Sequence, residues 1–130
     1  MAYTRSITIA DASFDDVVEQ TEAALGEEDF GVITEVDVRA TFQEKLDEDI
    51  GEYRILGACN PGKAYEGIQQ DAELGALLPC NVIVYESDDG ITVSVVDPEA
   101  LLGVADDPAF DSLAAEVSES FDRVLESLAD

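Results

Sequence analysis

The chain has 130 residues, 46% of them hydrophobic, and its 31 acidic residues against 6 basic residues give a net charge of −25. This length fits one domain, 1–130, and the apolar content separates the chain from acidic disordered proteins. The charge excludes nucleic acid as a partner, because phosphate contacts need a basic patch. The lack of histidine excludes Ser-His-Asp and Cys-His catalysis and His-ligated zinc.

The acidic residues are spread along the whole chain and do not form one tail. In molar salt the Debye length falls to about 3 Å and the repulsion between such charges is screened, so we expect a halophilic protein. The longest apolar run, 75–85, is about half of the ~20 residues that a membrane span requires, and it contains Pro79. We therefore expect a cytoplasmic location, no membrane partner and reduced cysteines.

In chain order, alternating apolar residues predict a first strand over 3–9. Ser13 is placed to cap a helix that carries one apolar stripe, and Gly31 is the expected stop. A second strand follows over 32–38. Thr41, with Glu44 three residues later, is expected to open a short second helix.

The second half begins with a strand over 53–58 that leads into Asn60 and Pro61, the cap and first position of a helix over 62–70. Strands over 81–86 and 91–96 form a hairpin, and the apolar face of a last helix covers 110–128. The order is β-α-β-α-β-α-β-β-α. It predicts an α/β (α+β) fold of two layers, with helices packed on one side of a mixed β-sheet.

The basic residues cluster in an otherwise acidic chain. Arg39, Arg54 and Lys63 lie within 25 residues of each other, and Lys63 falls in the first turn of the helix that Asn60 caps. A cation opposes the helix dipole there, so a small anion held by the helix N-terminus, Lys63 and Arg54 would explain it, with Thr41 as a hydrogen-bond donor. The alternative is that these cations pair with nearby acids such as Glu52 and Glu66.

Two cysteines form a second candidate site. Cys59 directly precedes a helix start, where free N–H groups favour a thiolate, whereas Cys80 leads into an apolar strand. Their spacing matches no Cys-x-x-Cys metal or redox pattern, so we expect no metal site and no cofactor. If their strands are antiparallel neighbours, the two thiols approach each other; if the strands are parallel, they cannot. Ordinary burial of both thiols in the core is the third possibility.

Several motifs in order resemble a known family. They are Glu35 to Thr41 (EVDVRAT), Arg54 to Pro61 (RILGACNP) with Ala64-Tyr65-Glu66, Leu77 to Val82 (LLPCNV), and Val95 to Pro98 (VVDP). From residue 3 to about 125 the chain is similar to the bacterial and archaeal domain of unknown function 302 family, and its acidity suggests a halophilic archaeal-type member. The resemblance implies a compact α/β fold and a homodimer, and it implies no reaction.

The sequence thus leaves the function unknown, with three hypotheses. The first is a cytoplasmic domain that binds a small anionic ligand at the helix N-terminus after Cys59, through Asn60, Lys63, Arg54, Arg39 and Thr41. The second is a thiol enzyme or redox sensor that uses Cys59 with Cys80. The third is a non-catalytic structural or interaction protein.

Overall fold

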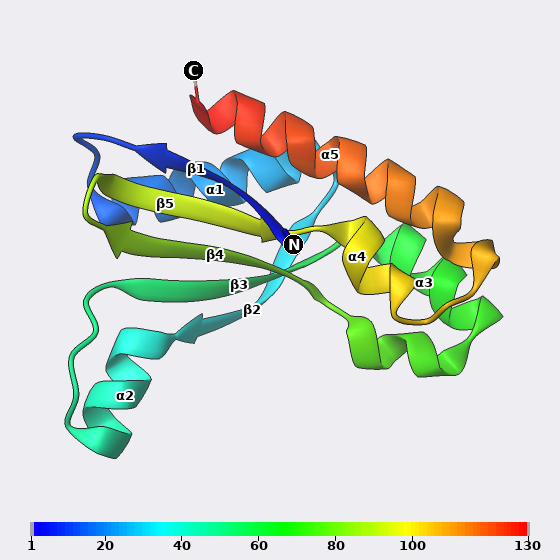
Figure 1. Cartoon of the computed structure of the whole chain (residues 1–130), viewed down its shortest axis with the longest axis horizontal. Coiled ribbons are helices and arrows are strands. Elements are labelled where there is room, and N and C mark those ends of the chain that lie inside the picture. The colour runs from blue at the N-terminus through cyan, green and yellow to red at the C-terminus, as the bar shows by residue number, and fades with distance from the viewer. Residues whose placement is uncertain (1, 130) are drawn as a thin grey trace.

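The computed structural model describes residues 2–129 and has a single five-stranded sheet in that range (Figure 1). The strands are β1 (Thr4–Ile9), β2 (Gly31–Asp37), β3 (Tyr53–Cys59), β4 (Cys80–Ser87) and β5 (Gly90–Val96), in the order β1-β5-β4-β3-β2. The helices are α1 (Phe14–Glu27), α2 (Val38–Leu46), α3 (Pro61–Gln70), α4 (Pro98–Gly103) and α5 (Asp111–Ala129), with 3₁₀ turns at Ala72–Leu77 and Pro108–Phe110.

The predicted α+β class is confirmed, but the sheet is not mixed: all four strand pairings are antiparallel. The reason lies in the helical connections. The long helix α1 carries the chain from β1 at one edge to β2 at the other edge, so the two strands it joins do not pair. The connections through α2 and α3 leave and re-enter the sheet at the same end, which makes them long hairpins.

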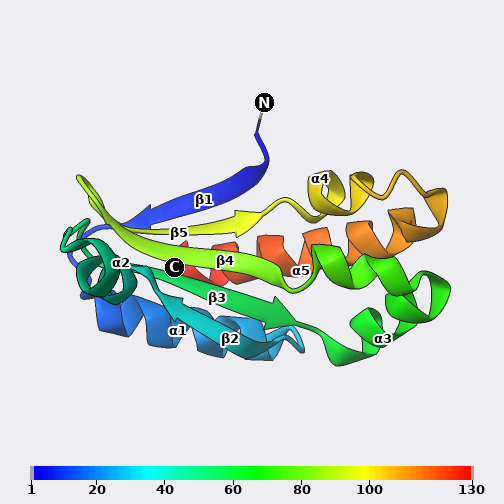
Figure 2. The ribbon, with the colours of Figure 1, turned by 90° about the horizontal axis from the view of Figure 1, so that it is seen from below.

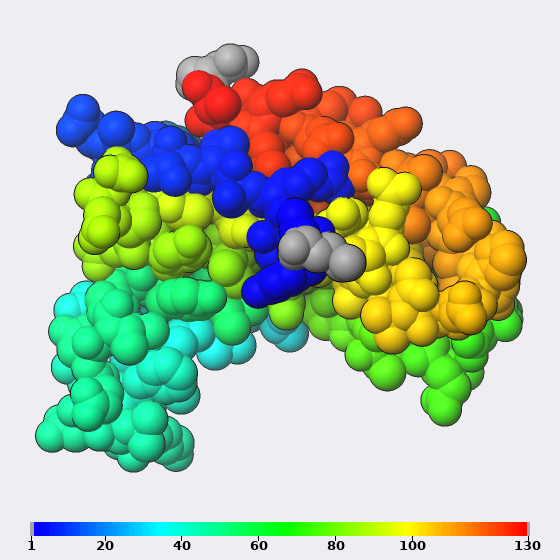
Figure 3. All heavy atoms as spheres, viewed as in Figure 1, coloured from blue at the N-terminus to red at the C-terminus, as the bar shows by residue number. Residues whose placement is uncertain are grey.

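One face of the sheet is covered by α1 and α5, as Figure 2 shows. Both helices bury their apolar stripes there, including Val17, Leu25, Phe121 and Val124, against Val82, Val84, Val93 and Val95 of the sheet. The remaining helices do not cover the opposite face. Helices α3 and α4 lie beyond one end of the sheet under the first half of α5, and α2 stands out from the body (Figures 1 and 3).

Short-range signals set most helix boundaries. Ser13 and Asn60 cap helices with their side-chain oxygens, as predicted, and Asp97 and Asp107 do the same. The expected stop at Gly31 is wrong, because α1 ends at Glu27 and Gly31 already begins β2. The tight turn between them uses Asp29, whose φ is 65°.

The expected start of the second helix at Thr41 is also wrong. Asp37 caps α2 by accepting a hydrogen bond of 2.9 Å from the Ala40 N–H, so the helix begins three residues earlier. Thr41 lies inside the helix, and its hydroxyl donates to the Asp37 carbonyl at 2.9 Å. Aspartate caps a helix as well as threonine does, and Asp37, the last residue of β2, takes this role.

Gly57 allows two segments to pack directly on β3. A Cβ at this position would overlap Thr34 Oγ1 and lie 2.8 Å from Pro79 Cγ, whereas a Cβ at Gly26 would meet nothing within 4 Å. We therefore expect Gly57→Ala to reduce the free energy of unfolding by about 2 kcal/mol or more, because overpacking of this kind is seldom relieved. The matched change Gly26→Ala in α1 is expected to raise it by up to about 1 kcal/mol. Salt-matched chemical denaturation measures both; equal effects of the two variants would contradict the packing argument.

Candidate functional site

The two cysteines lie at the same end of the sheet. Strands β3 and β4 are antiparallel neighbours, β3 ends at Cys59 and β4 begins at Cys80. In the register of this pair Cys80 lies opposite Ala58, so the two cysteines are one residue out of direct alignment. The strands thus run antiparallel, as an approach of the two thiols requires, while the one-residue offset directs the two side chains to opposite faces of the strand pair. Both are free; Cys59 is half-buried and Cys80 is buried.

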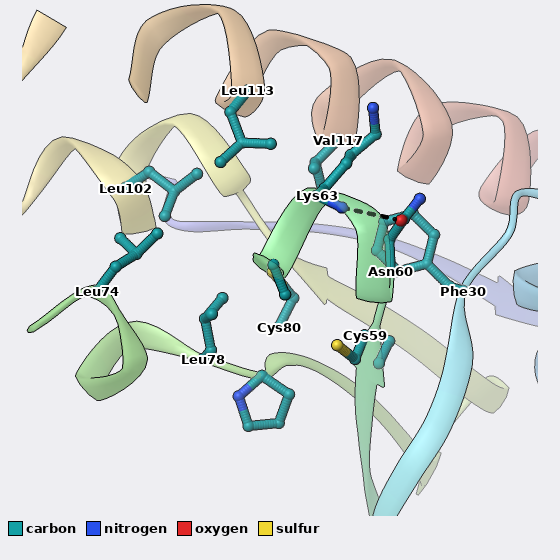
Figure 4. A pocket seen from close by; sticks show the side chains of 13 residues that line it. Phe30, Cys59, Asn60, Lys63, Leu74, Leu78, Cys80, Leu102, Leu113 and Val117 are labelled. Atoms are coloured by element: carbon teal, nitrogen blue, oxygen red, sulfur yellow. Dashed lines mark hydrogen bonds between the residues drawn. The ribbon is translucent and has the colours of Figure 1, made fainter. Parts of the chain in front are cut away.

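Both cysteines are among the residues that line one small pocket (Figure 4). Its volume is about 30 Å³, room for one or two water molecules. Apart from the cysteines, Asn60 and Lys63, its wall is apolar and comes from the turn before β2, β3, α3, the segment before β4, α4 and α5. It comprises Phe30, Ala58, Ala64, Leu74, Leu78, Pro79, Leu102, Leu113 and Val117.

Sequence reasoning missed most of this wall. Leu113 and Val117 were visible as part of the apolar face of the last helix, but that pattern does not say what the face covers. Phe30, Leu74 and Leu102 come from three separate turns or short helices, and only the fold brings them to the cysteines.

Asn60 is committed to the start of α3. Its side-chain oxygen accepts the Lys63 backbone N–H at 3.2 Å, and its carbonyl accepts the Ala64 N–H at 2.9 Å. Pro61 at the first helical position has no N–H to satisfy. The expected N-cap is therefore present, and it places Cys59 two residues before the first residue of a ten-residue helix.

The side chain of Lys63 leaves the pocket. It runs toward α5, away from the two thiols (Figure 4), and its Nζ donates to Glu116 Oε2 at 2.7 Å. The groove that contains this ion pair is also lined by Arg123 and by four further carboxylates, those of Glu27, Glu28, Asp29 and Glu119, so its net charge is negative. This local charge opposes the binding of a small anion.

The other candidate anion ligands lie at the opposite end of β3. Arg54 is five residues from Cys59 along the strand, a span of about 17 Å. Its guanidinium donates to Glu35 Oε1 at 2.8 Å, and its Cζ lies 5.4 Å from the centre of the Phe14 ring. The bond to Glu35 raises the pKa of Arg54.

Arg39 follows the same pattern. Its Nε donates to Asp49 Oδ1 at 3.0 Å and its Nη1 donates to Glu52. These bonds raise the pKa of Arg39 and lower that of Asp49. The structure therefore separates Arg39, Arg54 and Thr41 from Cys59, Asn60 and Lys63. Each of these cations is paired with a carboxylate, as in the alternative to anion binding. Arg39 pairs with Glu52, whereas Lys63 pairs with Glu116 and not with Glu66.

The environment of the two thiols differs. Burial, followed by the charge of the nearby Cys59, raises the pKa of Cys80 to about 11. A buried thiol of this kind is protonated at neutral pH and is a poor nucleophile.

Within residues 2–129 no group of three or more Cys, Asp or Glu side chains is arranged to hold a metal ion, and no helix in that range is long and apolar enough to cross a membrane.

Comparison with known proteins gives a family and a fold. The family model described as domain of unknown function DUF302 matches residues 5–128. No curated protein matches the chain. The chain is similar to the crystal structure of an uncharacterized conserved DUF302 protein from Bacillus stearothermophilus, with 25% sequence identity and a TM-score of 0.90 over 98% of this chain and 99% of that one.

Proposed function

The chain belongs to the DUF302 family, whose description assigns no function, and we propose from its geometry that it is a thiol-based redox sensor. Cys59 is the reactive thiol and Cys80 is its resolving partner. The observation that carries this proposal is that a half-buried and a buried cysteine, 21 positions apart in the sequence, line one pocket.

A peroxide is the oxidant in this proposal. The Cys59 thiolate attacks one peroxide oxygen, the O–O bond breaks, and the departing oxygen leaves as water or an alcohol after taking up a proton. Cys59 is then a sulfenic acid. The Cys80 sulfur next attacks the Cys59 sulfur, the S–O bond breaks, a water molecule leaves and a disulfide forms. An external dithiol returns both residues to thiols.

The high pKa of Cys80 limits the second step. The attacking species is its thiolate, which is rare at neutral pH when the pKa is about 11. The sulfenic acid on Cys59 therefore persists long enough to be trapped, and disulfide formation accelerates as the pH rises toward 11.

The anion-binding hypothesis has less support. The cation expected to hold the ligand, Lys63, is neutralised by Glu116, and further carboxylates surround the pair. The pocket behind it is apolar and has room for only one or two water molecules. An anion would have to displace Glu116 from Lys63 and remain in a strongly negative field.

The proposal is tested by oxidising the reduced protein with one equivalent of hydrogen peroxide in molar KCl. Dimedone is expected to label Cys59 in Cys80→Ser, and the native chain is expected to form one intramolecular Cys59–Cys80 disulfide, seen by peptide mass. Cys59→Ser is the matched control and is expected to consume peroxide at least about tenfold more slowly, since burial blocks Cys80. A native chain that keeps both thiols, or equal oxidation of the two variants, would refute the sensor.

The setting of this chemistry is part of the proposal. The net charge of −25 supports a salt-rich working solution, and the two free cysteines support a reducing compartment, the cytoplasm. In such a compartment the sensor rests in its dithiol form and responds only when peroxide appears.

A further inference from the structure

The pocket beside Cys59 offers mainly hydrocarbon to a bound molecule. Nine of the 13 residues that line it are apolar. Leu74, Leu102 and Leu113 come from three different elements and gather to one side of the two cysteines (Figure 4). A wall of this kind favours the alkyl part of a ligand, because each CH₂ group that it removes from water strengthens binding about fourfold.

The polar side chains of the wall do not prepare it for a charged ligand. The side-chain oxygen of Asn60 accepts the Lys63 backbone N–H, and the Lys63 ammonium group donates to Glu116 outside the pocket. A charged molecule entering the pocket would lose its water and gain no free counter-ion, which is costly. The pocket therefore selects an uncharged molecule.

The surface next to the pocket disfavours anions as well. The neighbouring groove shares Asn60 and Lys63 with the pocket, and its carboxylates outnumber its two cations. An oxidant that carries a carboxylate would meet this negative field before it reached Cys59. Local charge and loss of hydration thus act in the same direction.

The size of the pocket limits the length of the alkyl group. A volume of about 30 Å³ holds one or two groups of the size of a water molecule, and a methyl or methylene group is of about that size. Leu74 and Leu102 are only 2% and 5% exposed, so this part of the wall is packed in the core and cannot move aside easily. One or two carbons fit, whereas a branched or aromatic group does not.

We propose that the oxidant of Cys59 is a short, uncharged alkyl hydroperoxide with one or two carbons. This inference rests on the proposed sensor function and names its substrate class. The alkyl group lies against the apolar wall, and the Cys59 thiolate attacks the terminal peroxide oxygen. The S–O bond forms and the O–O bond breaks, which leaves a sulfenic acid; the alkoxide takes a proton from water and departs as methanol or ethanol. Hydrogen peroxide has no alkyl group to place on this wall.

The rate at which different peroxides consume the Cys59 thiol tests the proposal. The native chain is treated in molar KCl with hydrogen peroxide, ethyl hydroperoxide or tert-butyl hydroperoxide, and the remaining Cys59 thiol is measured by peptide mass. Each rate constant is divided by that of the same peroxide with N-acetylcysteine, which removes the intrinsic reactivity of the peroxide. The normalised rate constant is expected to be about 15-fold higher for ethyl hydroperoxide than for hydrogen peroxide, since two carbons are buried. It is expected to fall at least about tenfold from the ethyl to the tert-butyl compound, which overfills the pocket.

A wall variant and a matched control separate the role of the pocket from that of the fold. Leu78→Asn places an amide in the wall at a half-buried position of similar volume and is expected to reduce the 15-fold preference to threefold or less. Ile68→Asn makes the same change on α3 at a position that is 40% exposed and does not line the pocket, and it is expected to keep the preference.

The outcomes distinguish this inference from the sensor function on which it rests. If all three peroxides oxidise Cys59 with equal normalised rate constants, or if tert-butyl hydroperoxide is the fastest, the substrate class is wrong and the sensor remains. An equal loss of preference in Leu78→Asn and Ile68→Asn would also overturn the role of the wall. If Cys59 resists all three peroxides, the sensor function fails, and the substrate class fails with it.

Discussion

The melting temperature is expected to rise by about 20 °C or more between 0.1 M and 3 M KCl. This corresponds to roughly 5 kcal/mol at about 4 °C per kcal/mol for a domain of this size. The reason is the net charge of −25, which opposes the compact state most strongly where the Debye length is long. Natural domains have only about 5–15 kcal/mol of stability, so the chain is expected to be largely unfolded in dilute buffer.

The ion pairs of the structure do not offset this repulsion. Arg5, Arg39, Arg54, Lys63 and Arg123 each pair with at least one carboxylate, but 6 basic residues cannot neutralise 31 acidic ones. Exposed pairs contribute only about 0–1 kcal/mol each, and salt weakens them. Aspartates that cap helices lose some dipole stabilisation in salt as well. Both effects oppose the expected rise in melting temperature, but they are smaller than the stabilisation gained when salt screens the repulsion.

The shape of the salt dependence identifies its cause. Screening acts mostly below about 1 M, where the Debye length has already fallen to ~3 Å, whereas exclusion of solutes from the surface continues to grow with concentration. Most of the rise is therefore expected below about 1 M KCl, and sucrose at equal osmolality is expected to produce a much smaller one. A melting temperature that is flat or falls with KCl would contradict the halophilic interpretation.

Local chemistry could be predicted from the sequence, whereas the spatial arrangement of the strands could not. Asn60 before Pro61 and Asp97 before Pro98 define helix starts because a cap acts within three residues. The direction of strand pairing depends on which strands become neighbours, and β1 pairs with β5 some 90 residues later. A helix between two strands suggests a parallel crossover, but here α1 spans the sheet from edge to edge and no parallel pair forms.

In the candidate site, too, the local chemistry could be predicted and the spatial arrangement could not. The helix start after Cys59 was evident from the sequence. Whether Cys59 approaches Cys80 depended on the direction of strand pairing, which the sequence left open. The partner of Lys63 is Glu116, 53 residues away, and nothing in the local pattern selects it over Glu66. Arg39 and Arg54 are near Lys63 in the sequence and distant in space, because β3 carries the chain from one end of the sheet to the other.

Alkylation of the native protein by iodoacetamide at pH 7.5 in molar KCl is expected to label Cys59 at least about 100-fold faster than Cys80. Two effects of the burial of Cys80 favour Cys59. Cys59 is half-buried, whereas Cys80 is 6% exposed. Burial also raises the pKa of Cys80 to about 11, so only about one part in several thousand of this thiol is ionised at pH 7.5.

The pH dependence separates these two causes. If ionisation limits Cys80, its rate rises about tenfold per pH unit until the pH approaches 11, because the reactive thiolate is lost as the pH falls below that value. If access limits it, its rate follows local opening and stays low across this range. Labelling in Cys59→Ser and Cys80→Ser, quantified by peptide mass, assigns each rate to one sulfur and removes the effect of one thiol's charge on the other.

Equal slow labelling of the two cysteines, or faster labelling of Cys80, would show that Cys59 is ordinary packing at the end of β3. The redox proposal would then lose its reactive thiol.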